Sequence, residues 1–200
     1  MMGNKFRTIL FAAMVILLLA ATASAGSVSV EINANTDDVA GVVEYDSQAF
    51  EAVLNTGGGL IFSDNDYTLG NLHIALKDEL FAPALTLGLG FKGLVGEADV
   101  SQEDYDVTAI GFVLLGEYDF RKIYLNFPLL IFAEFSGSPD PMSFRDTTSY
   151  MDFNTGIRAY IVRTAAIVAG YRVIEINFEG SGSSDKLTDD AFYIGLRLTF

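Results

Sequence analysis

Hydrophobic and polar residues alternate over long stretches of this chain, and the pattern is clearest at its end. The even positions from Phe192 to Phe200 are all apolar, and the odd positions between them carry polar, small or charged groups such as Arg197. Side chains of a β-strand point to opposite faces with a period of two. Residues 191–200 therefore predict a strand with one apolar face, which ends on an aromatic residue.

The same alternation recurs upstream in segments of roughly barrel-strand length, about ten residues, separated by turn residues. This pattern predicts an all-β, antiparallel, up-and-down transmembrane barrel with short periplasmic turns, long outer loops and both termini at the periplasmic side. An eight-stranded barrel and a soluble, lipocalin-like periplasmic barrel are the alternatives. Ten strands are favoured, at residues 27–34, 39–45, 50–62, 67–76, 84–94, 107–120, 124–135, 150–161, 165–178 and 191–200.

Two strands carry a predicted irregularity. Pro128 lacks a backbone donor and predicts a local break in the strand at 124–135. At Val173 and Ile174 the apolar phase of the strand at 165–178 slips by one residue, which predicts a bulge. Longer polar stretches predict outer loops at residues 95–106, 136–149 and 179–190.

The first 25 residues have the pattern of a secretory signal peptide. Lys5 and Arg7 precede an uncharged apolar run at 8–20, and Ala23-Ser24-Ala25 offers a cleavage site. The run is too short for a membrane-spanning helix, which needs about 20 residues. We therefore expect a signal peptide at 1–25 and one barrel domain at 26–200, located in the outer membrane of a Gram-negative bacterium.

The composition agrees with a membrane barrel. The chain is half hydrophobic and yet has a formal net charge of −14, which suits an apolar wall with acidic loops. Such acidity argues against nucleic acid as a partner. The chain has no cysteine, so zinc-finger, redox and cysteine-nucleophile sites are excluded. We expect no cofactor.

Several charged residues lie on the predicted inner face of the strands. Arg172 is expected roughly opposite Arg197, so carboxylates from Glu117, Glu134 or Glu31 must approach these two cations. A ladder of ion pairs that fills a narrow barrel is the favoured interpretation, and a charged constriction in a narrow pore is the alternative. The predicted lumen cluster comprises Lys92, Glu117, Glu134, Arg158, Arg172 and Arg197.

The single histidine, His73, also lies on the predicted inner face. A barrel hydrolase would need a serine or an aspartate within hydrogen-bond reach of this histidine, and Ser63 or Asp66 could supply it. One histidine with such neighbours is a weak signal, so we expect no enzymatic activity. An outer-membrane lipid-modifying enzyme remains the alternative.

Carboxylates gather in the predicted outer loops. Their oxygens suit hard divalent cations, although no calcium-loop spacing is present and no dedicated metal site is expected. Solvated loops are the simpler interpretation, and contact with lipopolysaccharide phosphates through Mg²⁺ or Ca²⁺ is the alternative. The residues are Glu97, Asp99, Glu103, Asp104, Asp106, Asp189 and Asp190.

Aromatic residues near the predicted strand ends indicate interfacial girdles. We interpret the terminal Phe200 as an insertion signal for the barrel-assembly machinery. The other expected partners are periplasmic chaperones during biogenesis and outer-membrane lipid with lipopolysaccharide, and the protein is expected to be a monomer. The girdle residues are Tyr118, Phe120, Phe135, Phe153, Phe192 and Phe200.

The end of the chain, with Gly170-Tyr171-Arg172-Val173-Ile174, a Gly/Ser/Asp loop and then residues 190–200, resembles the YfaZ-family outer-membrane proteins. Ser63-Asp64-Asn65-Asp66 and Ala82-Pro83-Ala84-Leu85 running to Lys92-Gly93-Leu94 are further similarities. The resemblance covers roughly the last three quarters of the chain. This chain departs from the family pattern because it has no Trp and because its middle is more aliphatic. The resemblance implies a small outer-membrane barrel and no established activity.

Overall fold

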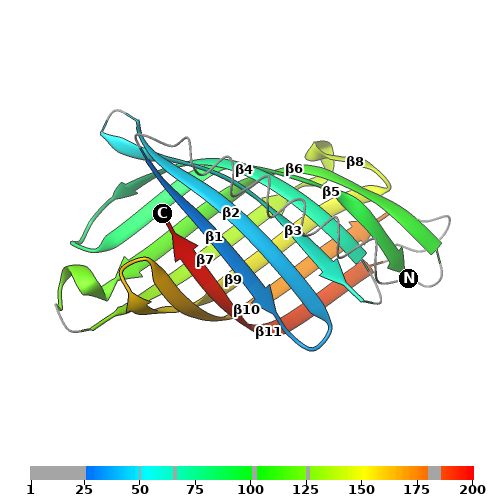
Figure 1. The fold of residues 1–200 in the computed structure, drawn as a ribbon. Coiled ribbons are helices and arrows are strands. Elements are labelled where there is room, and N and C mark those ends of the chain that lie inside the picture. The colour runs from blue at the N-terminus through cyan, green and yellow to red at the C-terminus, as the bar shows by residue number, and fades with distance from the viewer. Residues whose placement is uncertain (1–25, 50, 65–66, 101–102, 125–126, 180–185) are drawn as a thin grey trace.

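The structure is a computed structural model that describes residues 26–49, 51–64, 67–100, 103–124, 127–179 and 186–200. The predicted signal peptide lies outside these residues. The described strands form one antiparallel sheet that closes into a barrel, as Figure 1 shows. Pairing runs from β5 through β4, β3, β2, β1, β11, β10, β9 and β7 to β6, which pairs with β5 again. The predicted ten-stranded, up-and-down class is therefore confirmed.

A short eleventh strand, β8, pairs with β6 beside the barrel wall. Two 3₁₀ turns are described, η1 (Phe120–Lys122) and η2 (Asp140–Met142), and no described helix is long and apolar enough to cross a membrane. The strands are β1 (Gly26–Ala34), β2 (Asp38–Ala49), β3 (Ala52–Ser63), β4 (Tyr67–Glu79), β5 (Leu85–Val100), β6 (Glu103–Asp119), β7 (Leu129–Ser138), β8 (Ser143–Arg145), β9 (Thr147–Val162), β10 (Ala165–Phe178) and β11 (Lys186–Thr199).

The barrel closes between its first and last strands. The register runs from Ser29 opposite Thr199 to Ala34 opposite Ile194. Beyond this ladder, the Val28 N–H donates to the Phe200 carbonyl at 3.1 Å and the Phe200 N–H donates to the Val28 carbonyl at 2.8 Å. The start of β1 and the end of β11 thus share one end of the barrel, called the terminal end below. The other end is called the opposite end.

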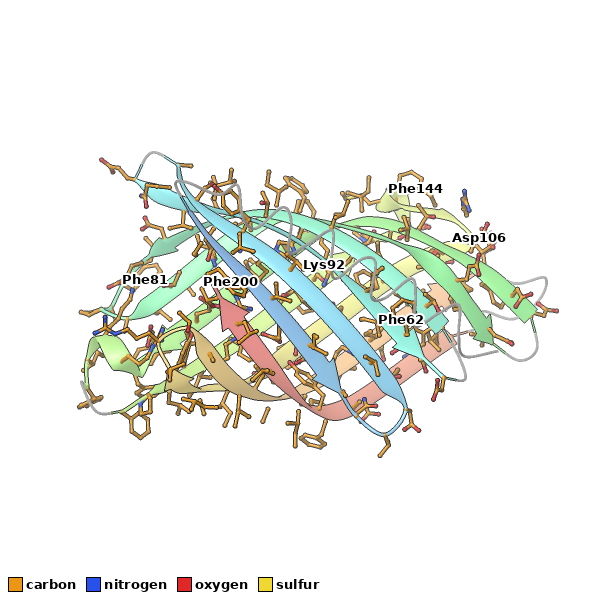
Figure 2. The ribbon with its side chains drawn as sticks, viewed as in Figure 1. Phe62, Phe81, Lys92, Asp106, Phe144 and Phe200 are labelled. Atoms are coloured by element: carbon orange, nitrogen blue, oxygen red, sulfur yellow. The ribbon has the colours of Figure 1, made fainter. Side chains whose placement is uncertain are left out.

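The outer wall of the barrel is apolar. Leu72 is 75% exposed and Phe192 78% exposed, and similar side chains project from the wall around the barrel in Figure 2. A soluble lipocalin-like barrel would turn its polar faces outward instead. The apolar wall therefore excludes that alternative and is the surface that lipid covers in a membrane barrel.

Aromatic side chains flank this wall. Tyr118, Phe120 and Phe127 form an edge-to-face chain at the terminal end, with ring centroids 4.8 Å and 5.4 Å apart. Nearer the opposite end, Tyr171 and Phe192 pair across β10 and β11 with centroids 4.7 Å apart. This placement agrees with the predicted girdles, because amphipathic and aromatic rings favour the membrane interfaces.

The strands extend further at the opposite end than the polarity of the sequence predicts. Most of the predicted loop at 95–106 is paired strand, because β5 continues to Val100 and β6 begins at Glu103. The predicted loop at 136–149 likewise contains β8 and the start of β9, and β11 begins at Lys186, within the predicted loop at 179–190. Strands that rise above the apolar band have a polar outer face, so polarity there does not mark the end of a strand.

The start of β7 confirms the break predicted at Pro128. The ladder begins at Leu129, directly after the proline. The Pro128 carbonyl still accepts a hydrogen bond from the Tyr160 N–H at 2.8 Å. Proline therefore sits at the strand boundary, where its missing N–H costs no ladder bond.

The predicted bulge near Val173 and Ile174 is wrong. The pairing of β10 with both neighbours runs through these residues without interruption, and the register shifts of β10 against β9 lie at Ala165/Ala166 and Asn177/Phe178. Ile174 and its apolar successors face inward, because the barrel interior is itself apolar at the opposite end. The buried apolar cluster there consists of Tyr67, Leu69, Leu94, Ala98, Tyr105, Val107, Ala109, Tyr150, Ile174, Ile176, Phe178 and Leu187.

Candidate functional site: ion pairs inside the barrel

The inner wall combines small residues with long charged ones. A β-carbon added to Gly195 would collide with the Asn33 side chain, and one added to Gly170 would collide with the Tyr193 ring. Because glycine has no side chain, the space over these inward positions is occupied by the side chains of Asn33 and Tyr193. The lumen is thus built to hold side chains, which is usual for narrow barrels.

Lys92 is the centre of the first charged group. Its Nζ lies 2.8 Å from Glu134 Oε1 and 2.7 Å from Asp152 Oδ2. The Tyr150 hydroxyl donates a further hydrogen bond of 2.9 Å to the same Asp152 oxygen. Lys92 comes from β5, Glu134 from β7 and both Tyr150 and Asp152 from β9, so this group ties three strands together.

Two arginines share carboxylates in the terminal half of the barrel. Arg197 Nη1 lies 3.1 Å from Glu31 Oε2, and its Nη2 donates to Glu44. Arg158 Nη1 lies 2.8 Å from Glu117 Oε1, and its Nε lies 3.6 Å from the same Glu31 oxygen. The carboxylate of Glu31 therefore separates two guanidinium groups that would otherwise repel each other.

Arg172 belongs to a third group, nearer the opposite end. Its Nη2 lies 2.7 Å from Asp38 Oδ2 and 3.2 Å from Asp189 Oδ2, and it donates to the Tyr67 hydroxyl at 3.1 Å. The predicted opposition of Arg172 and Arg197 is wrong, since Arg172 pairs with Ala191 and Arg197 with Ala166 in the ladder. The expected register assumed a loop over 179–190, but β11 begins at Lys186, and this shorter connection shifts the pairing.

All six predicted lumen residues face inward, and carboxylates approach the cations as expected. Sequence reasoning anticipated the anions Glu31, Glu117 and Glu134. It did not identify Asp38, Glu44, Asp152 and Asp46 as anionic partners, although each has the inward phase of its strand, and Asp46 lies 3.0 Å from Lys77 Nζ. Asp189, predicted as an outer-loop contact, instead lies inside the barrel beside Arg172.

His73 is buried within the same interior. Its Nε2 lies 2.7 Å from the Asn55 side-chain oxygen and 4.0 Å from Glu44 Oε1. The histidine faces Gly57 on β3, several residues along the strand from Ser63, and Asp66 lies outside the described residues. Ser63 is therefore not brought to His73.

The predicted loop carboxylates are distributed over the opposite end. Asp106 pairs with Arg145 at 2.7 Å, and Asp190 accepts a hydrogen bond from the Tyr171 hydroxyl at 3.0 Å. Among the described residues, no three His, Asp or Glu side chains converge closely enough to hold a metal ion. Two directly opposed pairs lie on the outer face of the β5–β6 hairpin, Glu97 with Asp106 and Asp99 with Asp104.

Lys92→Met tests whether the interior depends on its ion pairs. The variant leaves Asp152 and Glu134 without their cation, and an uncompensated buried charge costs about 3–5 kcal/mol in the free energy of unfolding. Urea unfolding in lipid micelles measures the loss. Lys122→Met is the matched control, because it removes an exposed lysine from its pair with Glu79 and should change little. Equal effects of the two substitutions would contradict the expectation.

Comparison with known proteins agrees with this architecture. The family model described as "YfaZ precursor" matches residues 5–200. Outer membrane protein YfaZ of Escherichia coli (strain K12) is 29% identical over 147 residues, which cover 74% of this chain and 75% of that protein.

Among solved structures, one described as "Unveiling the Mechanism Behind the in-meso Crystallization of Membrane Proteins" is 12% identical with a TM-score of 0.47, over 88% of this chain and 83% of that one. The KdgM porin in complex with disordered oligogalacturonate is 10% identical with a TM-score of 0.39, over 87% and 99% of the two chains. Because the family model matches nearly the whole sequence, this chain belongs to the YfaZ family of outer-membrane β-barrel proteins.

Proposed function

We propose that this protein is a structural barrel of the outer membrane, monomeric and closed to ions, with its terminal end in the periplasm. The observation that carries the proposal is the pairing of the interior charges. Each lysine and arginine on the inner face of the described strands lies within 4 Å of a carboxylate. Charges that are paired within the protein are not free to meet passing ions, whereas the charges that line a pore are.

The pairs also span the lumen. Arg172 of β10 reaches Tyr67 of β4, although four strands separate these two in either direction round the sheet. Lys92 of β5 reaches Asp152 of β9 across two intervening strands. Side chains that meet from distant walls narrow the lumen of a barrel of this size.

Planar-bilayer recording of the refolded protein tests this proposal. We expect no steady single-channel openings, because the interior side chains block the path of ions. Heat-modifiable gel mobility at the monomer position verifies that the sample is folded, and a general porin in the same bilayer verifies insertion. Reproducible ion-selective openings would overturn the proposal in favour of a narrow pore.

The proposal assigns no catalytic role to His73. Its imidazole is held by Asn55 and lies beside Glu44, and none of the contacts described for it involves a hydroxyl nucleophile. A buried histidine satisfied by an amide is a structural group.

His73→Ala therefore should not change the lipid A and phospholipid pattern of cells that express the protein. Mass spectrometry of extracted lipids compares this variant with the wild type and with cells that lack the protein. A lipid species that requires the protein and disappears in the variant would support the enzyme alternative.

We also propose that the acidic outer face of the β5–β6 hairpin meets lipopolysaccharide phosphates through divalent cations. Directly opposed carboxylates repel each other, and a cation shared with a phosphate relieves that repulsion. Arg145 offsets part of the charge of the Glu97–Asp106 pair through Asp106, so the proposal rests mainly on Asp99 and Asp104. The pairs Glu97–Asp106 and Asp99–Asp104 lie just beyond the exposed apolar residues Val95 and Ile110 of the same strands.

A chelator should then lower the melting temperature of the protein in micelles that contain lipopolysaccharide. The double variant Glu97→Gln/Asp99→Asn should lose most of this dependence, because it removes one carboxylate from each pair. Glu51→Gln/Asp78→Asn, at the terminal end, is the matched control and should keep the wild-type response. If the chelator does not change the melting temperature of the wild-type protein, the proposal is refuted.

A further inference from the structure

We propose that the barrel interior has two parts: a dry apolar plug at the opposite end and a water-accessible, anionic vestibule in the terminal half. The plug is the inner part of the buried apolar cluster, with Leu69, Tyr105, Val107, Ile176 and Phe178 at its centre. This inference rests on the proposed closed state and names what closes it. The plug, and not the ladder of ion pairs, is the seal.

The plug joins walls that are not neighbours in the sheet. Leu69 of β4 and both Ile176 and Phe178 of β10 are fully buried. The Tyr105 ring of β6 stacks on the Phe178 ring with centroids 4.6 Å apart and planes at 22°. The barrel itself is narrow, since Cα atoms of β5 and β11 lie within 8 Å although four strands separate them in either direction round the sheet.

An apolar constriction of this kind excludes water. An internal water molecule needs several polar partners, and the aliphatic and aromatic groups at the centre of the plug supply few. Ions cross such a constriction only with their hydration shells, so a dry segment blocks conduction even where the walls are not in full contact. The plug is therefore sufficient to close the lumen.

The terminal half of the interior is different, because its anions remain accessible. The side chains of Lys92 and Arg158 are 6% and 9% exposed. By contrast, three carboxylates keep more accessible surface, with 23% for Glu134, 26% for Glu117 and 30% for Asp46, whereas Glu31 is 6% exposed. The accessible part of these ion pairs is therefore mainly the oxygens of Glu134, Glu117 and Asp46, which makes the surface offered to water in this half negative.

This arrangement means that the ion pairs stabilise the wall without sealing it. Water and small cations can reach the accessible carboxylate oxygens from the terminal end, where the strands end in turns. Once the plug is opened, the path runs past Glu134, Glu117 and Glu44, which favours cations over anions.

Thiol labelling separates the two parts, and the chain suits it because it has no native cysteine. Thr86 faces the vestibule opposite Glu117, and Ala109 faces the plug and is 2% exposed. We expect Thr86→Cys to react with a charged methanethiosulfonate at nearly the rate of the exposed control Lys122→Cys. Ala109→Cys should react about 100-fold more slowly, since its labelling requires opening of the plug. Rapid labelling of both would overturn the plug, and slow labelling of both would overturn the vestibule.

Bilayer recording of matched variants tests which part is the seal. Tyr105→Ala/Phe178→Ala should produce cation-selective openings, whereas Lys92→Met should stay silent. Phe91→Ala/Phe112→Ala is the control, because it removes an aromatic pair of 5.3 Å centroid distance from the outer wall. If Tyr105→Ala/Phe178→Ala does not fold, as judged by loss of heat-modifiable gel mobility, Leu69→Ala/Ile176→Ala is used in its place.

The outcomes distinguish this inference from the proposed function. A wild-type barrel that conducts contradicts the proposed function, and labelling alone then decides whether the plug exists. A silent wild type with silent plug variants overturns the inference and leaves the closed state intact. Openings in Lys92→Met with silent plug variants would make the ion pairs the seal.

Discussion

The structure depends on the need to pair every backbone N–H and C=O group of a chain that crosses lipid. No water is present in the hydrocarbon to satisfy them, so the sheet must have no free edge. The seam between β1 and β11 meets this need, down to the reciprocal bonds of Val28 and Phe200. Once the seam forms, the register of each strand decides which side chains meet lipid and which meet the lumen.

Closure of the barrel also brings the buried charges of the interior to partners of opposite sign. Each buried ion has lost its water and needs a partner, and most partners lie on strands far apart in the sequence. Glu31 of β1 forms ion pairs with Arg197 of β11 and Arg158 of β9. Asp38, at the start of β2, forms an ion pair with Arg172 of β10. The charges are compensated only in the closed barrel, which ties correct pairing of the strands to the free energy of folding.

The polarity of the lumen changes along the barrel axis. On β10 the inward positions pass from Arg172 to Ile174, Ile176 and Phe178 within a few residues. In the sequence, this change looks like a one-residue shift of the alternation, because apolar residues of a membrane barrel are expected to face lipid. The continuous ladder shows that the apolar residues stay inside, where they pack on residues such as Leu69 of β4 and Tyr105 of β6.

Alternation with a period of two is a local property, so the sequence by itself determined most strands and the faces of residues such as Lys92 and Arg158, and it favoured ten strands over eight. It also indicated the break at Pro128, because the missing donor is a property of one residue. Only the tertiary structure decided that Arg172 meets Asp38 and not the neighbourhood of Arg197, and that residues 95–100 and 103–106 continue as paired strands. Contacts across a lumen depend on the stagger of all ten strands, and that stagger exists only after the sheet has closed.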